Sequence, residues 1–555
     1  MRHRANHSTK ETQQSPDKRT KPKQAAPVRL LQGRLSVKKL RHTHLRTALL
    51  AGLVLAAGVS GAHAQGTSLR IAAAGNDLGT MDPFRATSTP DIGVVSMMFN
   101  GLVRITPGKA TPEAIEPDLA TSWTSTDDKL SWTFSLRDDV QCHDGAKLTA
   151  DDVVFSLKRA ASKASSSFFA EYAAFQTIEA ADPKTVKIVL SKPVPGFLGL
   201  LAPYHGGNII CKAAAEKAGD DFARHPVGTG PFQFVEYQPQ QFVKLKANEA
   251  YFRGAPHIKE VTYRYILSDS SRDLAYQSGE IDLSYGRQDP NWINRMKQLP
   301  NTKVVVLGPG ELFNVHLNMT QKPLDDIRVR QAIADAIQRP ALVKFKGAEI
   351  AREATSIVPA GYLGHADVGL APYDPAKAKK LLAEAGYPDG ITINSIQTTL
   401  PSMMNTMQAV QALLKQAGIT LNLAPVDHPT FHAQIRQDLS QVVLYGAARF
   451  PVADTYLTQF FESDAIVGKP SAVTNFSHCD IADAEIKAAR VEPDPEKQKA
   501  LWAEAQKKIV EQVCAVPMFE LLQLWAWKDT LDFGYPVEAS LSLIPPVTEK
   551  TRFTN

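Results

Sequence analysis

Residues 225–237 read HPVGTGPFQFVEY, in which two glycines one residue apart are closed by a proline and followed by aromatic residues. A phosphate-binding loop would need Lys and Ser or Thr after its last glycine, and a helix to follow. Here Pro231 and Phe232 follow instead, and the spaced aromatic residues are typical of a strand. The stretch therefore predicts a tight structural bend into a strand, for which Gly228 and Gly230 are suited because glycine can adopt positive φ.

The segments on either side of this bend show strands and helices in irregular alternation. Residues 131–136 alternate as a half-buried strand, and Thr149 with Asp152 forms a capping box that begins a helix. Residues 374–450 combine two helices with clear start and stop signals and a strand at 419–426, which predicts a βαβ unit. The whole pattern indicates a mixed α/β fold.

The chain begins with a segment that is typical of a secretory signal. A basic run at 38–46 precedes the apolar residues 47–61 and a small-residue site at 62–64, which predicts cleavage near Ala64/Gln65. The apolar run is shorter than the roughly 20 residues of a membrane span, and no cysteine follows the cleavage site to carry a lipid. We therefore expect a soluble periplasmic protein, with the polar residues before the run disordered or an over-long start.

The positive charge of the chain is concentrated in this leader. Residues 1–64 hold 13 of the 62 basic and 2 of the 57 acidic residues, so the remaining 491 residues have 49 basic, 55 acidic and a net charge of −6. The folded part thus gives no support for nucleic-acid binding, which requires a basic surface. A chain of 491 residues also exceeds one hydrophobic core, so we expect two or more domains.

The four cysteines are an even number in a chain that is expected to reach an oxidising compartment. The spacing along the chain favours Cys142 with Cys211 and Cys479 with Cys514, because each pair would then fall within one part of the fold. Four free buried thiols remain an alternative.

Six stretches resemble, in order and spacing, the family 5 extracytoplasmic solute-binding proteins, the receptors of peptide, nickel and related ABC importers. They are residues 118–160, 225–237, 246–261, 278–283, 314–339 and 374–390. The resemblance implies a periplasmic binding protein type II-like α/β fold with two large lobes, a hinge and a smaller inserted subdomain. The implied boundaries are 65–110, 228–310 and 516–555 for lobe I, 111–227 for the inserted subdomain, and 311–515 for lobe II.

The same resemblance makes residues 442–461 the most informative stretch for the ligand. Peptide-binding members carry an aspartate there that pairs with the ligand's α-ammonium, whereas this chain has Pro451 at that position, Arg449 nearby and Asp454 farther along. An arginine facing the cleft would suit a carboxylate or phosphate on the ligand. The alternative is that Arg449 pairs with Asp454 or with another carboxylate on the rim.

A second departure lies upstream, where dipeptide binders hold the ligand's carboxylate with an arginine and this chain has Gln397. Gln397, Thr398 and Thr399 would offer neutral hydrogen bonds. Both ionic anchors of dipeptides are thus changed, and we expect simple dipeptides to bind poorly. The resemblance also points to four residues of the first lobe as ligand-binding: Thr80, Met81, Tyr285 and Arg287, although Tyr285 also fits a core position.

No metal, cofactor or catalytic chemistry is expected. His428 and His432 have the i, i+4 spacing of a metal pair, but Pro429 lies between them and a third ligand is missing. The chain has neither a G-x-S-x-G nor an H-E-x-x-H motif, and the acidic pair Asp151 and Asp152 fits helix capping.

The sequence therefore predicts a monomeric periplasmic receptor of an ABC importer. It would capture a small polar organic ligand, peptide-like or anionic, close over it, and deliver it to the transmembrane permease subunits. The alternatives within this class are an ordinary peptide receptor and a nickel- or haem-type receptor. The alternatives outside it are a secreted hydrolase and a sensor partner of a membrane receptor.

Overall fold

The structure is a computed structural model that describes residues 66–286, 289–468 and 474–554, all in one compact unit. The predicted signal, its cleavage site and Arg287 lie outside the described residues. Within the described ranges, no helix is both long enough and apolar enough to cross a membrane.

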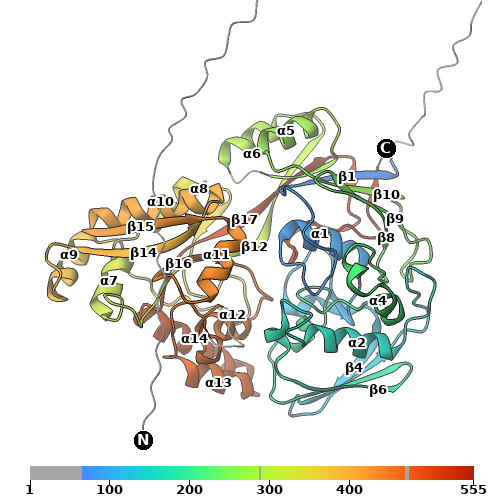
Figure 1. Cartoon of the computed structure of the whole chain (residues 1–555), viewed down its shortest axis with the longest axis horizontal. Helices are drawn as coiled ribbons and strands as arrows, with labels where there is room; N and C mark the ends of the chain where they lie inside the picture. Colours follow the sequence, from blue (N-terminus) through green and yellow to red (C-terminus); the bar gives the residue numbers. More distant parts are fainter. Residues whose placement is uncertain (1–65, 287–288, 469–473, 555) are drawn as a thin grey trace, which may run out of the picture. The chain divides into compact units, whose positions relative to one another are not determined.

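The largest element is a nine-stranded mixed sheet with the order β16-β12-β17-β11-β1-β10-β9-β8, in which β13 also pairs with β17. The strands are β1 (Ser68–Ala73), β8 (Phe232–Gln238), β9 (Phe242–Ala247), β10 (Glu260–Tyr265), β11 (Leu283–Tyr285), β12 (Thr302–Leu317), β13 (Ala351–Glu353), β16 (Val442–Ala447) and β17 (Ala515–Lys528). β1 is parallel to β10 and β11, and all other pairs are antiparallel. The two long strands β12 and β17 lie side by side and connect β16 to the rest of the sheet (Figure 1).

A separate four-stranded antiparallel sheet has the order β4-β5-β7-β6. Its elements are β4 (Ala120–Ser125), β5 (Ser131–Leu136), β6 (Phe175–Asp182) and β7 (Thr185–Leu190), with α2 (Ala150–Ala160) packed against β6 and β7. The predicted strand at 131–136 and the capping box of Thr149 and Asp152 are confirmed. This sheet lies inside the range 111–227 that was expected to be an inserted subdomain, but the lobe boundaries themselves stay a prediction.

The predicted βαβ unit is also present. It consists of β14 (Ile391–Thr398), α10 (Pro401–Gln416) and β15 (Ile419–Val426), and the two strands are parallel and in register over their whole length. It is preceded by α9 (Pro375–Glu384), which begins where the Asp374 side chain accepts a hydrogen bond from the Lys377 N–H. These confirmed elements establish the mixed α/β class.

The other elements cover the sheets or connect them. The helices are α1 (Thr89–Met98), α3 (Phe197–Leu200), α4 (Lys212–Ala218), α5 (Asp269–Gln277), α6 (Pro290–Lys297), α7 (Ile327–Asp335), α8 (Arg339–Lys346), α11 (His428–Arg436), α12 (Ala453–Phe461), α13 (Asp483–Val491) and α14 (Pro495–Glu511), and the remaining strands are β2 (Val103–Ile105), β3 (Ile115–Pro117), β18 (Leu531–Asp532) and β19 (Arg552–Phe553). Short 3₁₀ helices are η1 (Pro112–Ala114), η2 (Phe169–Tyr172), η3 (Gly219–Ala223) and η4 (Ser463–Ala465).

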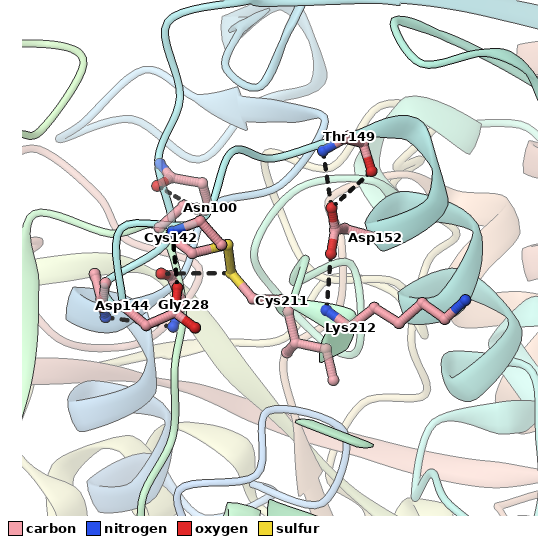
Figure 2. Close-up of a disulfide and its surroundings, with 12 residues drawn as sticks. Asn100, Cys142, Asp144, Thr149, Asp152, Cys211, Lys212 and Gly228 are labelled. Atoms are coloured by element: carbon pink, nitrogen blue, oxygen red, sulfur yellow. Dashed lines mark hydrogen bonds between the residues drawn. A yellow bond between two sulfur atoms is a disulfide. The ribbon is translucent and has the colours of Figure 1, made fainter. Parts of the chain in front are cut away.

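Both disulfides favoured by the sequence are formed, and the described residues hold no free cysteine. Cys142 and Cys211 have Cα atoms 6.2 Å apart, and Cys479 and Cys514 have Cα atoms 5.8 Å apart. Figure 2 shows the first disulfide between the turn before α2 and the start of α4, with the Gly228 carbonyl beside the Cys211 sulfur at 3.8 Å. The alternative of four free thiols is therefore wrong.

The bend at 225–237 leads into β8 as predicted, but the reason given for its glycines was wrong. Neither Gly228 nor Gly230 has a positive φ. A Cβ at Gly228 would lie 2.2 Å from the Met98 carbonyl oxygen, and one at Gly230 would lie 2.4 Å from the Met98 carbonyl carbon. The glycines are thus required because another backbone segment, at the end of α1, passes too close for any side chain.

Replacing Gly230 by valine should therefore lower the melting temperature, with a destabilisation of about 1–3 kcal/mol or more from overpacking against backbone. The conflict begins at Cβ, so Gly230→Ala and Gly230→Asn should be destabilising as well. Thermal denaturation of the three variants checks this. If asparagine, which tolerates positive φ, restores stability where alanine does not, the steric explanation is wrong.

Candidate functional site

Arg449 lies in the loop between β16 and α12, and its side chain is held by neutral groups. Its Nε donates to Gln459 Oε1 at 2.5 Å, its Nη1 donates to the Ala448 carbonyl at 2.8 Å, and the guanidinium lies 5.1 Å from the centre of the Phe460 ring. Among the described residues, no carboxylate comes within 4.0 Å of it. The Nη2 atom has no hydrogen-bond partner in this part of the chain, so one edge of the fork remains open.

Tyrosine rings surround this side chain. The Tyr362 hydroxyl bonds both the backbone N–H and the carbonyl of Arg449, at 2.7 Å each, and the ring meets that of Tyr456 edge to face. The ring centroid of Tyr445 lies 5.9 Å from that of Phe460, the ring that the Arg449 guanidinium contacts. Burial raises the pKa of Tyr362 and of Tyr456, which keeps both hydroxyls protonated. The tyrosines therefore offer hydrogen bonds but no negative charge.

A fourth tyrosine near Arg449, Tyr204, comes from a distant part of the sequence. Tyr204 stacks on His205 with ring centroids 3.8 Å apart, and His205 Nδ1 lies 3.1 Å from Glu171 Oε1. Burial raises the pKa of Tyr204, while the positive charge of Arg449 acts to lower it. The Tyr204 hydroxyl is thus within electrostatic range of the guanidinium.

Close packing beside Arg449 fixes this arrangement. Phe450 lies against α3, where a Cβ at Gly199 would come 2.4 Å from the Phe450 ring and one at Gly196 would come 3.0 Å from it. Only glycine allows the helix to approach so closely. The segment that carries Tyr204 is therefore packed directly against the loop that carries Arg449.

A half-buried acidic residue, Glu311, lies at an irregularity of β12. Between Leu307 and Glu311 the register of β12 against β17 shifts, which is the mark of a β-bulge, and bulges re-aim side chains. Glu311 Oε2 accepts a hydrogen bond from Gln523 Nε2 at 3.1 Å, and Gln523 Oε1 accepts one from the Tyr285 hydroxyl at 3.1 Å. The result is a polar chain from β11 through β17 to β12.

The electrostatics of Glu311 connect it to Arg449. Burial raises the pKa of Glu311, whereas the hydrogen bond from Gln523 and the charge of Arg449 lower it, and the first effect is the largest. Within the described ranges, no cation comes within 4.0 Å of Glu311, so its carboxylate has no ion-pair partner. Sequence analysis did not identify Glu311, Gln523 or Tyr204.

Tyr285 is the one first-lobe candidate that the structure places in this group, since it joins the Glu311 chain through Gln523. Thr80 and Met81 are held by other contacts. The Thr80 hydroxyl accepts the Asp82 N–H, and Met81 is fully buried in a hydrophobic core. Arg287 is outside the described residues.

Asp454 does not pair with Arg449. It is buried in the first turn of α12, and its Oδ1 lies 3.7 Å from Arg490 Nε. Burial raises the pKa of Asp454 to about 6, although the Arg490 charge lowers it. Arg490 in turn donates to Glu462 Oε2 at 2.7 Å, so these groups form a network of their own.

The three polar residues at the end of β14 face different surroundings. Gln397 is fully buried, and neither polar atom of its amide has a partner among the described residues. Thr398 Oγ1 lies 3.2 Å from His428 Nδ1, and Thr399 is exposed. None of these three residues bonds Arg449 in the described part of the chain, and their role in binding stays a prediction.

The histidine pair is formed on α11, with His428 Nε2 and His432 Nε2 3.1 Å apart. In the described ranges, no group of three or more His, Cys, Asp or Glu residues is arranged to hold a metal ion.

Comparison with known proteins decides the family. The family model described as bacterial extracellular solute-binding proteins, family 5, matches residues 114–468. This chain belongs to that family. The chain is also 31% identical over 488 residues to the glutathione-binding protein GsiB of Salmonella typhi. The aligned region covers 84% of this chain and 92% of GsiB.

Two solved structures are also similar to this solute-binding protein. MoaA of A. tumefaciens R10, in complex with mannopinic acid, is 48% identical with a TM-score of 0.83, covering 88% of this chain and 100% of MoaA. AgaA of the same strain, in complex with agropinic acid, is 25% identical with a TM-score of 0.77. The match covers 88% of this chain and 99% of AgaA. The periplasmic binding protein fold is thereby confirmed, and the similar proteins are solute-binding proteins rather than hydrolases.

Proposed function

We propose that this protein is the ligand-capturing component of an ABC importer and that its ligand is an organic acid similar to the one bound by MoaA. The observation that carries the proposal is the open guanidinium edge of Arg449, which has no carboxylate partner in the described part of the chain. A guanidinium is recognised best by a carboxylate, which can accept two parallel hydrogen bonds. In the MoaA and AgaA structures the bound molecule is an acid, mannopinic acid in one and agropinic acid in the other.

The residues that meet the ligand in this proposal are Arg449, the tyrosines beside it and the chain of Tyr285, Gln523 and Glu311. These groups come from β11, β12, β16, β17, α12 and the loops after α3, β13 and β16, so a ligand among them would contact several separate segments. Binding then stabilises the closed form only through its differential affinity for that form. No bond is made or broken, and the protein, exported as a monomer after cleavage near Gln65, hands the ligand to the permease subunits.

The proposal is tested by titrating mannopinic acid into residues 65–555 and by recording the melting temperature with and without it. We expect saturable binding and a raised melting temperature, because a ligand at 100 times its dissociation constant stabilises the folded state by about 2.7 kcal/mol. The ligand should be recovered unchanged by mass spectrometry. If only glutathione or dialanine raises the melting temperature, a peptide receptor is the correct assignment; if the acid is consumed, the protein is an enzyme.

A further inference from the structure

A cavity of about 660 Å³ lies at the start of α8 and shares no lining residue with the group around Arg449. Its walls come from three separate segments: residues 337–340 between α7 and α8, residues 353–355 at the end of β13, and residues 367 and 369–373 before α9. Small-molecule sites in proteins have volumes of about 300–1,000 Å³. The cavity therefore has the size of a small-ligand site, and the function proposed above does not use it.

Arg339, the first residue of α8, lines this cavity and is only 7% exposed. Its Nε donates to the Pro517 carbonyl and its Nη1 donates to the Ala371 carbonyl, at 2.7 Å each. Among the described residues, its Nη2 has no hydrogen-bond partner and no carboxylate comes within 4.0 Å of the guanidinium. Nη2 is also not among the polar atoms that are sealed from solvent without a hydrogen bond. Neutral carbonyls thus fix a buried positive charge while one edge of its fork stays open.

The surroundings of Arg339 favour a negative group at this open edge. Burial lowers the pKa of Arg339 to about 10, while the charges of Glu353 and Asp335 raise it. Asp335 is already paired with Lys377 at 3.0 Å. The N-terminus of α8 has no side-chain cap from Gln338, and the positive end of a helix dipole also attracts an anion. Because a buried charge is costly until it is paired, a carboxylate that reaches Arg339 would be bound favourably.

Glu353 supplies a negative charge on another wall of the same cavity. It ends β13, and side chains alternate along a strand, so it points away from the face on which Arg352 pairs with Glu520. Glu353 is exposed, and its carboxylate has no ion-pair partner within 4.0 Å in the described part of the chain. The other carboxylate of the walls, Asp367, lies 3.3 Å from His365 Nε2. The cavity therefore presents one positive and one negative group that are both without a close counter-charge.

We propose that this cavity is an accessory site for a small zwitterion, whose carboxylate binds Arg339 and whose ammonium group binds Glu353. A simple anion would be attracted by Arg339 but repelled by Glu353, and a simple cation would meet the reverse. A zwitterion complements both charges. Its carbon chain would contact the apolar residues of the walls, Ile337 and Leu370. This site is separate from the one that captures the transported ligand, and it does not depend on the identity of that ligand.

The first test titrates residues 65–555 with glycine, β-alanine and 4-aminobutyrate, which differ in the separation between their two charges. We expect saturable binding of at least one of them, and the same binding to Arg449→Ala, because Arg449 does not line the cavity. The tightest of the three is then compared with two analogues that lack one charge each, the acid without the amine and the amide of the amino acid. Wild type should bind the zwitterion about tenfold or more tightly than either analogue, since a hydrogen bond between charged groups is worth that factor or more.

Two variants assign each of these preferences to one residue. Glu353→Gln should remove the preference over the acid without the amine and keep the preference over the amide, and Arg339→Gln should do the reverse. The matched controls are Glu349→Gln, just before β13, where the carboxylate lies 3.7 Å from Lys297, and Arg328→Gln on the exposed surface of α7. Both controls should keep both preferences. Because Glu353 is exposed, its variant tests the site even where Arg339→Gln lowers the melting temperature.

Three results would overturn the accessory site. The first is that none of the three amino acids binds wild type, or that the zwitterion binds no better than its two analogues. The second is that binding is lost in Arg449→Ala, which would place the amino acid in the candidate site after β16 instead. The third is that Glu353→Gln keeps the preference over the acid without the amine, because Glu353 would then not be the partner of the ammonium group. Binding of mannopinic acid is measured separately, so each of these failures leaves the proposed function standing.

Discussion

Arg449→Ala should weaken the binding of mannopinic acid by roughly ten- to a hundred-fold or somewhat more. A hydrogen bond between charged groups contributes about 1.5–3 kcal/mol net, and each 1.4 kcal/mol is a factor of ten in affinity. The side chain is positioned by Gln459 and Ala448 while its Nη2 edge stays open, so its removal takes away the charge that the acid meets. Calorimetric titration measures the change.

Arg449→Lys should recover only part of this loss, since an ammonium keeps the charge but not the planar fork. The matched control is Arg436→Ala, which removes an exposed arginine from the end of α11 and should leave the affinity unchanged. Equal affinity of Arg449→Ala and wild type would show that Arg449 is a rim residue, and the anionic-ligand proposal should then be dropped.

Much of the fold could be predicted because its signals are local. Asp374 and Pro375 begin α9, and Thr149 with Asp152 begins α2, since each capping interaction involves residues within one turn of the helix. The alternation in 131–136 and in 419–426 likewise reports only on the strand that carries it.

The glycines of HPVGTG show where local reasoning ends. Two closely spaced glycines predict positive φ, which is a property of the residues themselves, but their actual constraint is the backbone of Met98, about 130 residues earlier in the chain. Such an approach is decided by the packing of α1 against the bend, and no pattern within 225–237 contains it. The sequence therefore predicted the bend correctly and its cause incorrectly.

The candidate site also contains residues that the sequence predicted and residues that it did not. Arg449 was found because its loop departs from the pattern of peptide-binding relatives, and Tyr285 joins the hydrogen-bonded chain to Glu311 through Gln523. Glu311 was missed because its position depends on the register of β12 against β17. The available signal was Gly308-Pro309-Gly310 just before it, a combination that marks a bulge in an otherwise apolar strand. No sequence pattern indicates Tyr204, because its position beside the Arg449 loop depends on the packing of α3 against Phe450.

The largest loss of stability is expected from removing the disulfide between Cys142 and Cys211. It closes a separation of 69 residues, for which the loop-entropy estimate is about 4 kcal/mol, within the typical 2–5 kcal/mol for a native disulfide. It also holds the bend, because the His143 N–H next to Cys142 donates to the Gly228 carbonyl at 2.9 Å. The double variant Cys142→Ala/Cys211→Ala should therefore show a clearly lower melting temperature and urea midpoint.

Part of this region should survive the loss of the covalent bond. Asp152 bonds the Thr149 N–H at 2.8 Å with one oxygen and the Lys212 N–H at 2.8 Å with the other, which connects the start of α2 to the start of α4 beside Cys211 (Figure 2). The matched control is Cys479→Ala/Cys514→Ala, whose separation is 35 residues. Because a twofold shorter loop is worth about 0.6 kcal/mol less, the control should be slightly the milder of the two. Unchanged stability of the Cys142→Ala/Cys211→Ala protein, with wild type equally unaffected by a reductant, would show that the bend is held by its hydrogen bonds alone.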